Sequence, residues 1–162
     1  MFERENNVCA FTLAYAARLL GDVTDDRMAF QPSPHANPPA WILGHLAVVA
    51  DFGLEMLGQS RRCNAAWHKA FSPGSDSSAG EFPVHDKATL LAAIDGGYKA
   101  LMTAAAKAND AALAKRIDMQ FFKDTPIQTV GDLITHMLTS HMSLHLGQLS
   151  AWRRTLGYAP LF

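Results

Sequence analysis

Residues 141–148 read His-Met-Ser-Leu-His-Leu-Gly-Gln, which sets two histidines four residues apart in an otherwise apolar pattern. Residues four apart on an α-helix project from one face, so His141 and His145 can bind a common ion. The intervening residues include no glutamate, unlike the His-Glu-x-x-His pattern of zinc proteases. Gln148 follows one turn later on the same face. It is a candidate catalytic residue that orients a ligand or a histidine ring, or alternatively an amide that contacts only solvent.

The helix that carries this pair is predicted to span residues 129–156. Thr129 and Asp132 resemble a capping box at its start, and Gly157, with Pro160 beyond it, provides a stop. Its inward positions alternate in steps of four and three, as in a helical bundle, and are Ile134, Leu138, His141, His145, Gln148 and Trp152. Both histidines therefore occupy positions where a bundle ordinarily has leucine.

A third histidine lies in a second strongly apolar run, Trp41-Ile42-Leu43-Gly44-His45-Leu46. Asn37 is predicted to cap this helix, Pro38-Pro39 suit its first turn, and Gly58 ends it after Leu57. The inward positions are Trp41, His45, Val48, Phe52 and then Glu55 or Met56. His45 thus faces the same interior as the other pair, and Glu55 is a second candidate catalytic residue.

Two further long helices are predicted, at residues 5–20 and 86–108. The first has Val8, Phe11, Tyr15 and Leu19 on its inward face, and the second has Leu91, Ile94, Tyr98, Leu101 and Ala105. Gly96-Gly97 weakens the second by about 1 kcal/mol per glycine unless close helix packing requires both. Residues 110–117 form a further helical turn or two, and residues 59–85 form a long connection. Trp67, Phe71 and Phe82 in this connection are expected to fold back onto the helices, and the sequence leaves open whether this connection is a lid.

These elements predict one domain over residues 1–162, with an all-α fold. We expect an up-down-up-down four-helix bundle with long connecting loops, in which the helices bearing His45 and His141 run parallel. No run shows the alternation of a strand.

Three inward histidines favour a divalent metal as their common partner, because an unpaired buried imidazole loses solvation that apolar carbons cannot restore. The alternative is three core histidines, each with its own hydrogen-bond partner. Three neutral nitrogens are the ligand number of catalytic zinc-type sites with open positions. The remaining histidines, His35, His68, His85 and His136, are expected outside the metal shell, the first three in loops and the last rotated by about 140° from His141.

Composition narrows the possible partners. The formal net charge of −1 provides no basic surface for nucleic acid. Cys9 and Cys63 are expected to be reduced, with Cys9 in the core, and no run is long enough for a membrane span. The acidic N-terminal residues do not resemble a signal peptide, so we expect a cytoplasmic protein.

The chain resembles the DinB/YfiT-like family of metal-dependent four-helix bundles. The resemblance rests on the Asn-Pro-x-x-Trp-Ile-Leu-Gly-His-Leu segment ending at Leu46 and on His-x-x-x-His-Leu-Gly-Gln-Leu from His141 to Leu149. It implies a divalent metal, commonly nickel or zinc, held by His45, His141 and His145. It also implies a homodimer. Characterised relatives in this family include S-transferases and an isomerase that use low-molecular-weight thiols.

The leading hypothesis is a metal-dependent enzyme that transfers a low-molecular-weight thiol to a small-molecule electrophile. The alternatives are a metal-dependent hydrolase, a non-catalytic metal-binding or stress-related module, and a haem bundle with His45 as an axial ligand. Arg153 and Arg154 either complement the dipole of the last helix or bind an anionic substrate.

Overall fold

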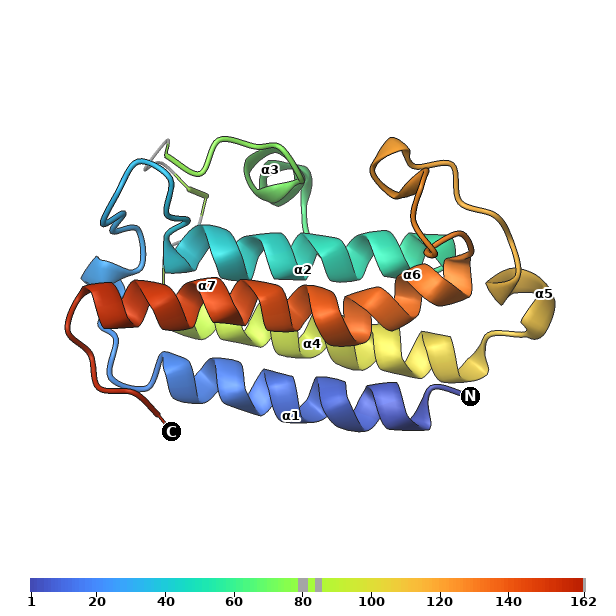
Figure 1. The fold of residues 1–162 in the computed structure, drawn as a ribbon, viewed down its shortest axis with the longest axis horizontal. Coiled ribbons are helices and arrows are strands. Elements are labelled where there is room, and N and C mark those ends of the chain that lie inside the picture. Colours follow the sequence, from blue (N-terminus) through green and yellow to red (C-terminus); the bar gives the residue numbers. More distant parts are fainter. Residues whose placement is uncertain (79–81, 84–85, 162) are drawn as a thin grey trace.

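Four long helical elements pack side by side in the computed structural model, which describes residues 1–78, 82–83 and 86–161 (Figure 1). They are α1 (Glu3–Leu19), α2 (Pro39–Met56), α4 (Lys87–Lys107) and the last element, which comprises α6 (Val130–His136), a π-helical segment (Met137–His141) and α7 (Met142–Thr155). Shorter helices are α3 (Ala65–Phe71) and α5 (Asp110–Leu113), with single 3₁₀ turns at Asp25–Arg27 and Gln120–Phe122. The all-α bundle predicted from the sequence is confirmed, and the long helices begin and end within two residues of the expected positions.

The order of helix directions differs from the expected up-down-up-down arrangement, because α4 begins at the same end of the bundle as α2. Lys87 Nζ donates to the carbonyls of Leu20 and Val23, directly after α1, and Ala40 N–H at the start of α2 donates to Met28. Figure 1 shows α2 and α4 running in one direction and α1 and α7 in the other. The segment after α2 is long enough to return along the bundle before α4 starts, so the order is up-down-down-up.

The helices that carry His45 and His141 are consequently antiparallel, not parallel as expected. Asn37, just before α2, bonds to Gln148 in α7. A Cβ atom built on Gly53, near the end of α2, would lie 3.1 Å from Met137 Sδ, well before α7 starts. Parallel and antiparallel helices can both bring their side chains to the same height along the bundle. His45 lies along α2 between the contact at Asn37 and the contact at Gly53.

The inward face of α1 also differs from the prediction. Val8 and Phe11 are 45% and 65% exposed, whereas the buried residues are Cys9, Thr12, Leu13, Ala16 and Leu19. The prediction followed the largest apolar side chains, but the bundle buries a face containing small residues, which lets α1 approach its neighbours closely. Cys9 is fully buried, as expected.

Helix α2 is the central helix, and most of its residues from Pro39 to Leu54 are buried. Close packing against α4 explains one of the two mid-helix glycines, because a Cβ atom on Gly97 would lie 3.2 Å from Ala50 Cβ. Pro38, not Asn37, occupies the N-cap position, with no side-chain cap. At the other end Gly58 adopts φ +73°, and the Gly58 and Gln59 amides bond back to Glu55 and Leu54, a Schellman stop as predicted.

The long connection folds back onto α2, as its aromatic residues predicted. Asn64 caps α3 by accepting from the Trp67 amide at 3.1 Å. Phe71 and Phe82 are buried and Trp67 is partly buried. The Phe71 ring lies directly over Gly44, where a Cβ atom would come within 2.5 Å of it. Helix α3 therefore packs closely on α2, one residue from His45.

The last helix contains a π-helical segment that the sequence pattern did not predict. The predicted capping box is present at Thr129 and Asp132, but a π turn accommodates one more residue than an α turn and so shifts the following register. The buried side chains beyond it are Met142, Leu146, Leu149, Trp152 and Arg153. His141 and His145 consequently lie half-buried beside this core stripe instead of within it.

Candidate metal centre

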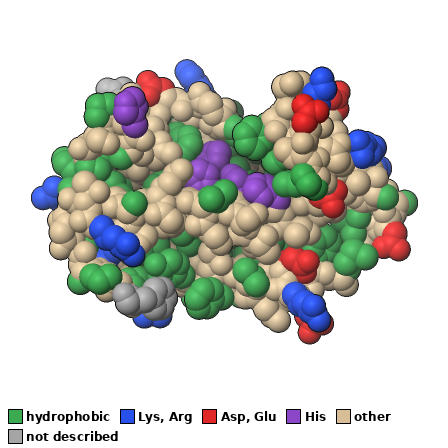
Figure 2. All heavy atoms as spheres, in the orientation of Figure 1, with side chains coloured by type: hydrophobic (Ala, Val, Ile, Leu, Met, Phe, Trp, Pro, Cys, Tyr) green, Lys and Arg blue, Asp and Glu red, His purple; other side chains and the backbone are tan. Residues whose placement is uncertain are grey.

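Three imidazoles from two helices converge on one point. Ligand nitrogens of His45, His141 and His145 all lie within 4.8 Å of one another. The ring centroids are 4.7 Å apart for His45 and His145, 4.6 Å for His141 and His145, and 5.4 Å for His45 and His141. Figure 2 shows histidine side chains reaching the surface between two raised parts of the molecule. The cluster could therefore hold one metal ion that substrate can approach.

The His45 ring is fixed from two sides. Its Nδ1 lies 2.8 Å from the Phe71 carbonyl oxygen, and since a carbonyl only accepts, Nδ1 must carry the proton. The lone pair is then on Nε2, the tautomer that a metal-binding histidine with an outer hydrogen-bond partner adopts. Trp41 stacks on the same ring, with centroids 4.7 Å apart and planes 6° from parallel. The backbone of α3 thus selects the tautomer of a side chain in α2.

The His145 ring is oriented by Gln148. The Gln148 Oε1 atom lies 3.2 Å from His145 Nδ1 and also accepts from Asn37 Nδ2 at 3.2 Å. An amide oxygen that accepts from both leaves the Nε2 lone pair of His145 free. Gln148 therefore contacts a histidine ring, one of the two arrangements expected from the sequence. Asn37, expected as a helix cap, instead holds this glutamine.

His141 has a buried ring nitrogen, Nδ1, that forms no hydrogen bond within the described part of the chain. A buried imidazole nitrogen without a partner destabilises the folded protein, and a hydrogen-bond acceptor or a metal ion would satisfy it. The fourth histidine of this region, His136, has its ring centroid only 5.5 Å from that of His141. The expected rotation of 140° assumed a regular α-helix, whereas the π segment between them brings residues five apart closer together. His136 Nδ1 pairs with Ser140 Oγ at 2.7 Å and lies outside the three-histidine group.

Burial keeps all three rings uncharged near neutral pH. Burial lowers the pKa of His45, and it lowers the pKa of His141 to about 3, with repulsion from His145 and His45 adding to the effect. Burial and repulsion from His45 lower the pKa of His145 to about 4. Neutral imidazole is the form that binds metal, and three nitrogen donors suit zinc and nickel. The donor set therefore fits a divalent cation.

A comparison with known protein families identifies the family of the chain. The sequence profile of the DinB superfamily matches residues 10–149, which include all three histidines. The chain belongs to the DinB superfamily. A search of curated proteins found no match. In the part of this DinB chain that the structure describes, no helix combines the length and the apolar character needed to cross a membrane.

The second catalytic candidate, Glu55, lies away from the histidines of this DinB site. It is ten residues beyond His45 on the same helix, about 15 Å along the axis at 1.5 Å per residue. Its carboxylate is exposed and pairs with Arg61 at 2.7 Å. The inward position predicted for Glu55 is therefore wrong, because the side chain is exposed and the prediction did not take the axial distance into account.

Asp51, in α2, has a supporting role for the site. It is fully buried and accepts hydrogen bonds from the Arg62 and Cys63 amides at 2.9 and 2.8 Å and from His68 Nε2 at 3.0 Å. His68, expected in a loop, belongs to α3. Asp51 thus holds against α2 the segment whose Phe71 carbonyl orients the His45 ring. The sequence contains an indication of this role, because Asp51 is the sole Asp, Glu, Lys or Arg from Pro38 to Leu54.

Two histidines expected outside the metal shell and the two candidate anion-binding arginines remain to be placed. His35 is exposed in the loop before α2, and His85 lies outside the described residues. Arg153 is buried and bonds to the Asp22 carboxylate and, at 2.6 Å, to the Leu19 carbonyl, so it joins the ends of α7 and α1 instead of facing the histidines. Arg154 is exposed.

Proposed function

We propose that this protein is a metal-dependent enzyme in which His45, His141 and His145 hold one divalent cation, nickel or zinc. The supporting observation is the convergence of three uncharged imidazoles, two of them with Nδ1 committed to outer partners. Three protein ligands leave coordination positions for a substrate. Positions of this kind distinguish catalytic sites from closed structural ones.

The proposed reaction is transfer of a low-molecular-weight thiol to a small electrophile. When bound, a divalent cation lowers the pKa of a thiol, so that thiolate is present near neutral pH. The sulfur forms a bond to the electrophilic carbon, the bond from that carbon to its leaving group breaks, and the thiol proton passes to solvent. Hydrolysis would follow the same course with water in place of the thiol.

The residues around the cluster favour the thiol over chemistry that needs a carboxylate base. Within the described residues, the group that could hold the ion contains histidines alone. Trp41, which is stacked on His45 and almost fully buried, excludes water from one side of the rings. Phe71 and Gln148 hold two of the rings in place, so little reorganisation is required when a ligand arrives.

The test is a turnover assay with the nickel- or zinc-loaded protein, cysteine or glutathione as thiol, and 1-chloro-2,4-dinitrobenzene as electrophile. The proposal predicts a thioether product that requires both metal and thiol and is lost in His45→Ala. Product formation from water alone would instead identify a hydrolase. A protein that binds metal without turnover would be a non-catalytic metal-binding module.

The organisation of the protein is also part of the proposal. One hydrophobic cluster from Phe2 to Trp152 supports a single domain over residues 1–162. The side chains of Phe11 and Leu144, both 65% exposed, offer apolar surface for a homodimer, which sedimentation analysis would detect. The free thiols of Cys9 and Cys63 agree with a cytoplasmic location.

A further inference from the structure

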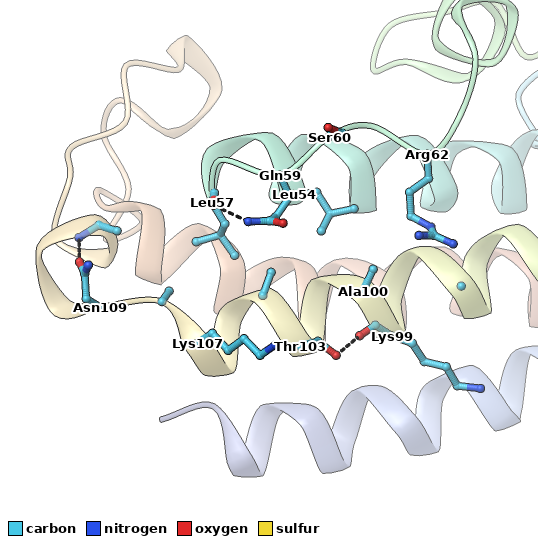
Figure 3. Close-up of a pocket in the computed structure, with 14 residues that line it drawn as sticks. Leu54, Leu57, Gln59, Ser60, Arg62, Lys99, Ala100, Thr103, Lys107 and Asn109 are labelled. Atoms are coloured by element: carbon cyan, nitrogen blue, oxygen red, sulfur yellow. Dashed lines mark hydrogen bonds between the residues drawn. The ribbon is translucent and has the colours of Figure 1, made fainter.

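A groove lies along a different part of the bundle, between α4 and the segment that follows α2 (Figure 3). Its volume is about 820 Å³. One wall is the end of α2 with residues 57–62, and the other is α4 from Gly96 to Lys107, continuing to Asn109 and Ala112. It shares no lining residue with the histidine cluster. The groove is therefore a separate candidate site.

The charges along this groove are all positive. Arg62, Lys99 and Lys107 line it, and among the described residues no Asp or Glu does. The whole chain has a formal net charge of −1, so this concentration of positive charge is a local property. Lys99 pairs with Asp95 at 2.7 Å. Arg62 and Lys107 supply the charge that remains available to a ligand.

Arg62 is held at the groove by its backbone, and its side chain lies against α4. Its amide donates to the buried Asp51 carboxylate at 2.9 Å, which fixes the point where the side chain starts. The guanidinium lies over α4, where a Cβ atom on Gly96 would be 3.4 Å from Arg62 Nη2. This distance is an ordinary van der Waals contact, so the guanidinium lies against the surface of α4 at Gly96, and an alanine at this position would also fit.

The guanidinium donors are free. Within the described residues, the Arg62 side chain has no hydrogen-bond or ion-pair partner, in contrast to the neighbouring Arg61, which pairs with Glu55. A guanidinium offers a planar set of donors that matches carboxylate and phosphate groups. An anion at this position would meet guanidinium donors that no other described group occupies.

The remainder of the groove is mixed in character. Leu54, Leu57, Ala100 and Ala104 present apolar surface between the two ends. The polar lining includes Gln59, Ser60 and Thr103, which offer uncharged hydrogen-bonding groups. A ligand that suits this lining has an apolar body and a terminal anionic group.

We propose that this groove binds a small amphipathic anion, with its carboxylate or phosphate on Arg62 and its apolar body against Leu54, Leu57 and the α4 alanines. Complementarity of charge and apolar surface together defines the ligand class. The site is independent of the metal centre, so binding here does not require the proposed enzymatic function.

The test is a titration of the full chain with hexanoate, hexyl phosphate, inorganic phosphate and hexylammonium, followed by amide chemical shifts in NMR spectra. We expect saturable shifts at Ser60, Gly96 and Ala100 with hexanoate or hexyl phosphate, and the stronger of the two identifies the anionic group. Arg62→Gln should weaken this binding at least tenfold, because it removes the cationic partner. Arg61→Gln, an exposed arginine one residue away and outside the lining, is the matched control and should bind as the wild type does.

Three results would show that the groove does not bind an organic anion through Arg62, and a fourth would show that the ligand class is wrong. They are an absence of saturable shifts with both organic anions, equal binding by Arg62→Gln and wild type, and equal binding of hexylammonium. If inorganic phosphate binds as tightly as hexyl phosphate, the apolar lining plays no part and the assigned ligand class is wrong. Arg62 is exposed, so its substitution should leave the fold intact, which the spectrum of the unliganded variant verifies.

Discussion

Replacing Gly44 by alanine tests whether α3 controls the geometry of His45. A Cβ atom at Gly44 would lie 2.5–2.6 Å from three atoms of the Phe71 ring. This approach is about 0.9 Å short of 3.4 Å, where ordinary van der Waals contact begins. Phe71 is fully buried and packs against Phe82 and Trp67, so its ring cannot simply rotate into solvent. The substitution must displace α3.

The displacement has two consequences of different size. Overpacking of this kind costs about 1–3 kcal/mol of the free energy of unfolding. A shift of about 0.9 Å away from α2 would also lengthen the 2.8 Å contact between His45 Nδ1 and the Phe71 carbonyl beyond hydrogen-bond range. Loss of such an outer partner lowers metal affinity by about 10- to 100-fold.

The assay combines urea unfolding with calorimetric titration of nickel and zinc, and Gly147→Ala is the matched control. Gly147 lies two residues after His145, and a Cβ atom there meets nothing within 4 Å. Its replacement should stabilise the helix by about 0.4–1 kcal/mol and leave metal affinity unchanged. If Gly44→Ala matches the wild type in both measurements, α3 does not support His45 as described.

Three further predictions concern residues away from the rings. Asp51→Asn should lower the free energy of unfolding in urea by about 1.5–3 kcal/mol, because an amide cannot accept from every donor that bonds to the buried carboxylate. Glu55→Gln, at an exposed ion pair, should lower it by less than about 1 kcal/mol. Equal effects of the two substitutions would contradict the role given to Asp51. Hydrogen bonds from Thr129 lower the pKa of Asp132 from its ordinary value of 3.8, so its stabilising contribution is complete above that value and is lost as pH falls through the lower folded pKa. The stability difference between wild type and Asp132→Asn should therefore shrink below about pH 4, and a constant difference down to pH 2 would refute this. Burial raises the pKa of Cys9 and of Cys63 to about 12, so both thiols should react with Ellman's reagent only after unfolding, and rapid reaction of the native protein would contradict their burial.

Local features of this protein were predictable because they depend on neighbouring residues. The capping box at Thr129, the stop at Gly58 and the i, i+4 pair His141–His145 each involve residues within one or two turns of a helix. Short-range rules of helix geometry apply to these features whatever the tertiary structure. The inclusion of His45 required one additional assumption, that both helices face the same interior.

The features that were missed depend on the path of the chain through space. Helical periodicity does not encode direction, so the parallel start of α2 and α4 became visible only from the contacts of Lys87. Helical periodicity does not predict the π segment that ends at His141. This segment brings the His136 ring next to the site. The carbonyl of Phe71 was unpredictable for another reason, since every residue has one and only the fold selects which of them reaches His45.

The central claim is that one divalent cation binds between His45, His141 and His145. The most direct test is a crystal structure of the protein grown with zinc, using diffraction data collected on both sides of the zinc absorption edge. The account predicts a single anomalous peak per chain, bonded to one nitrogen of each of the three rings at about 2.0–2.1 Å. A peak bound elsewhere, or three ordered rings with no peak between them at saturating zinc, would contradict it.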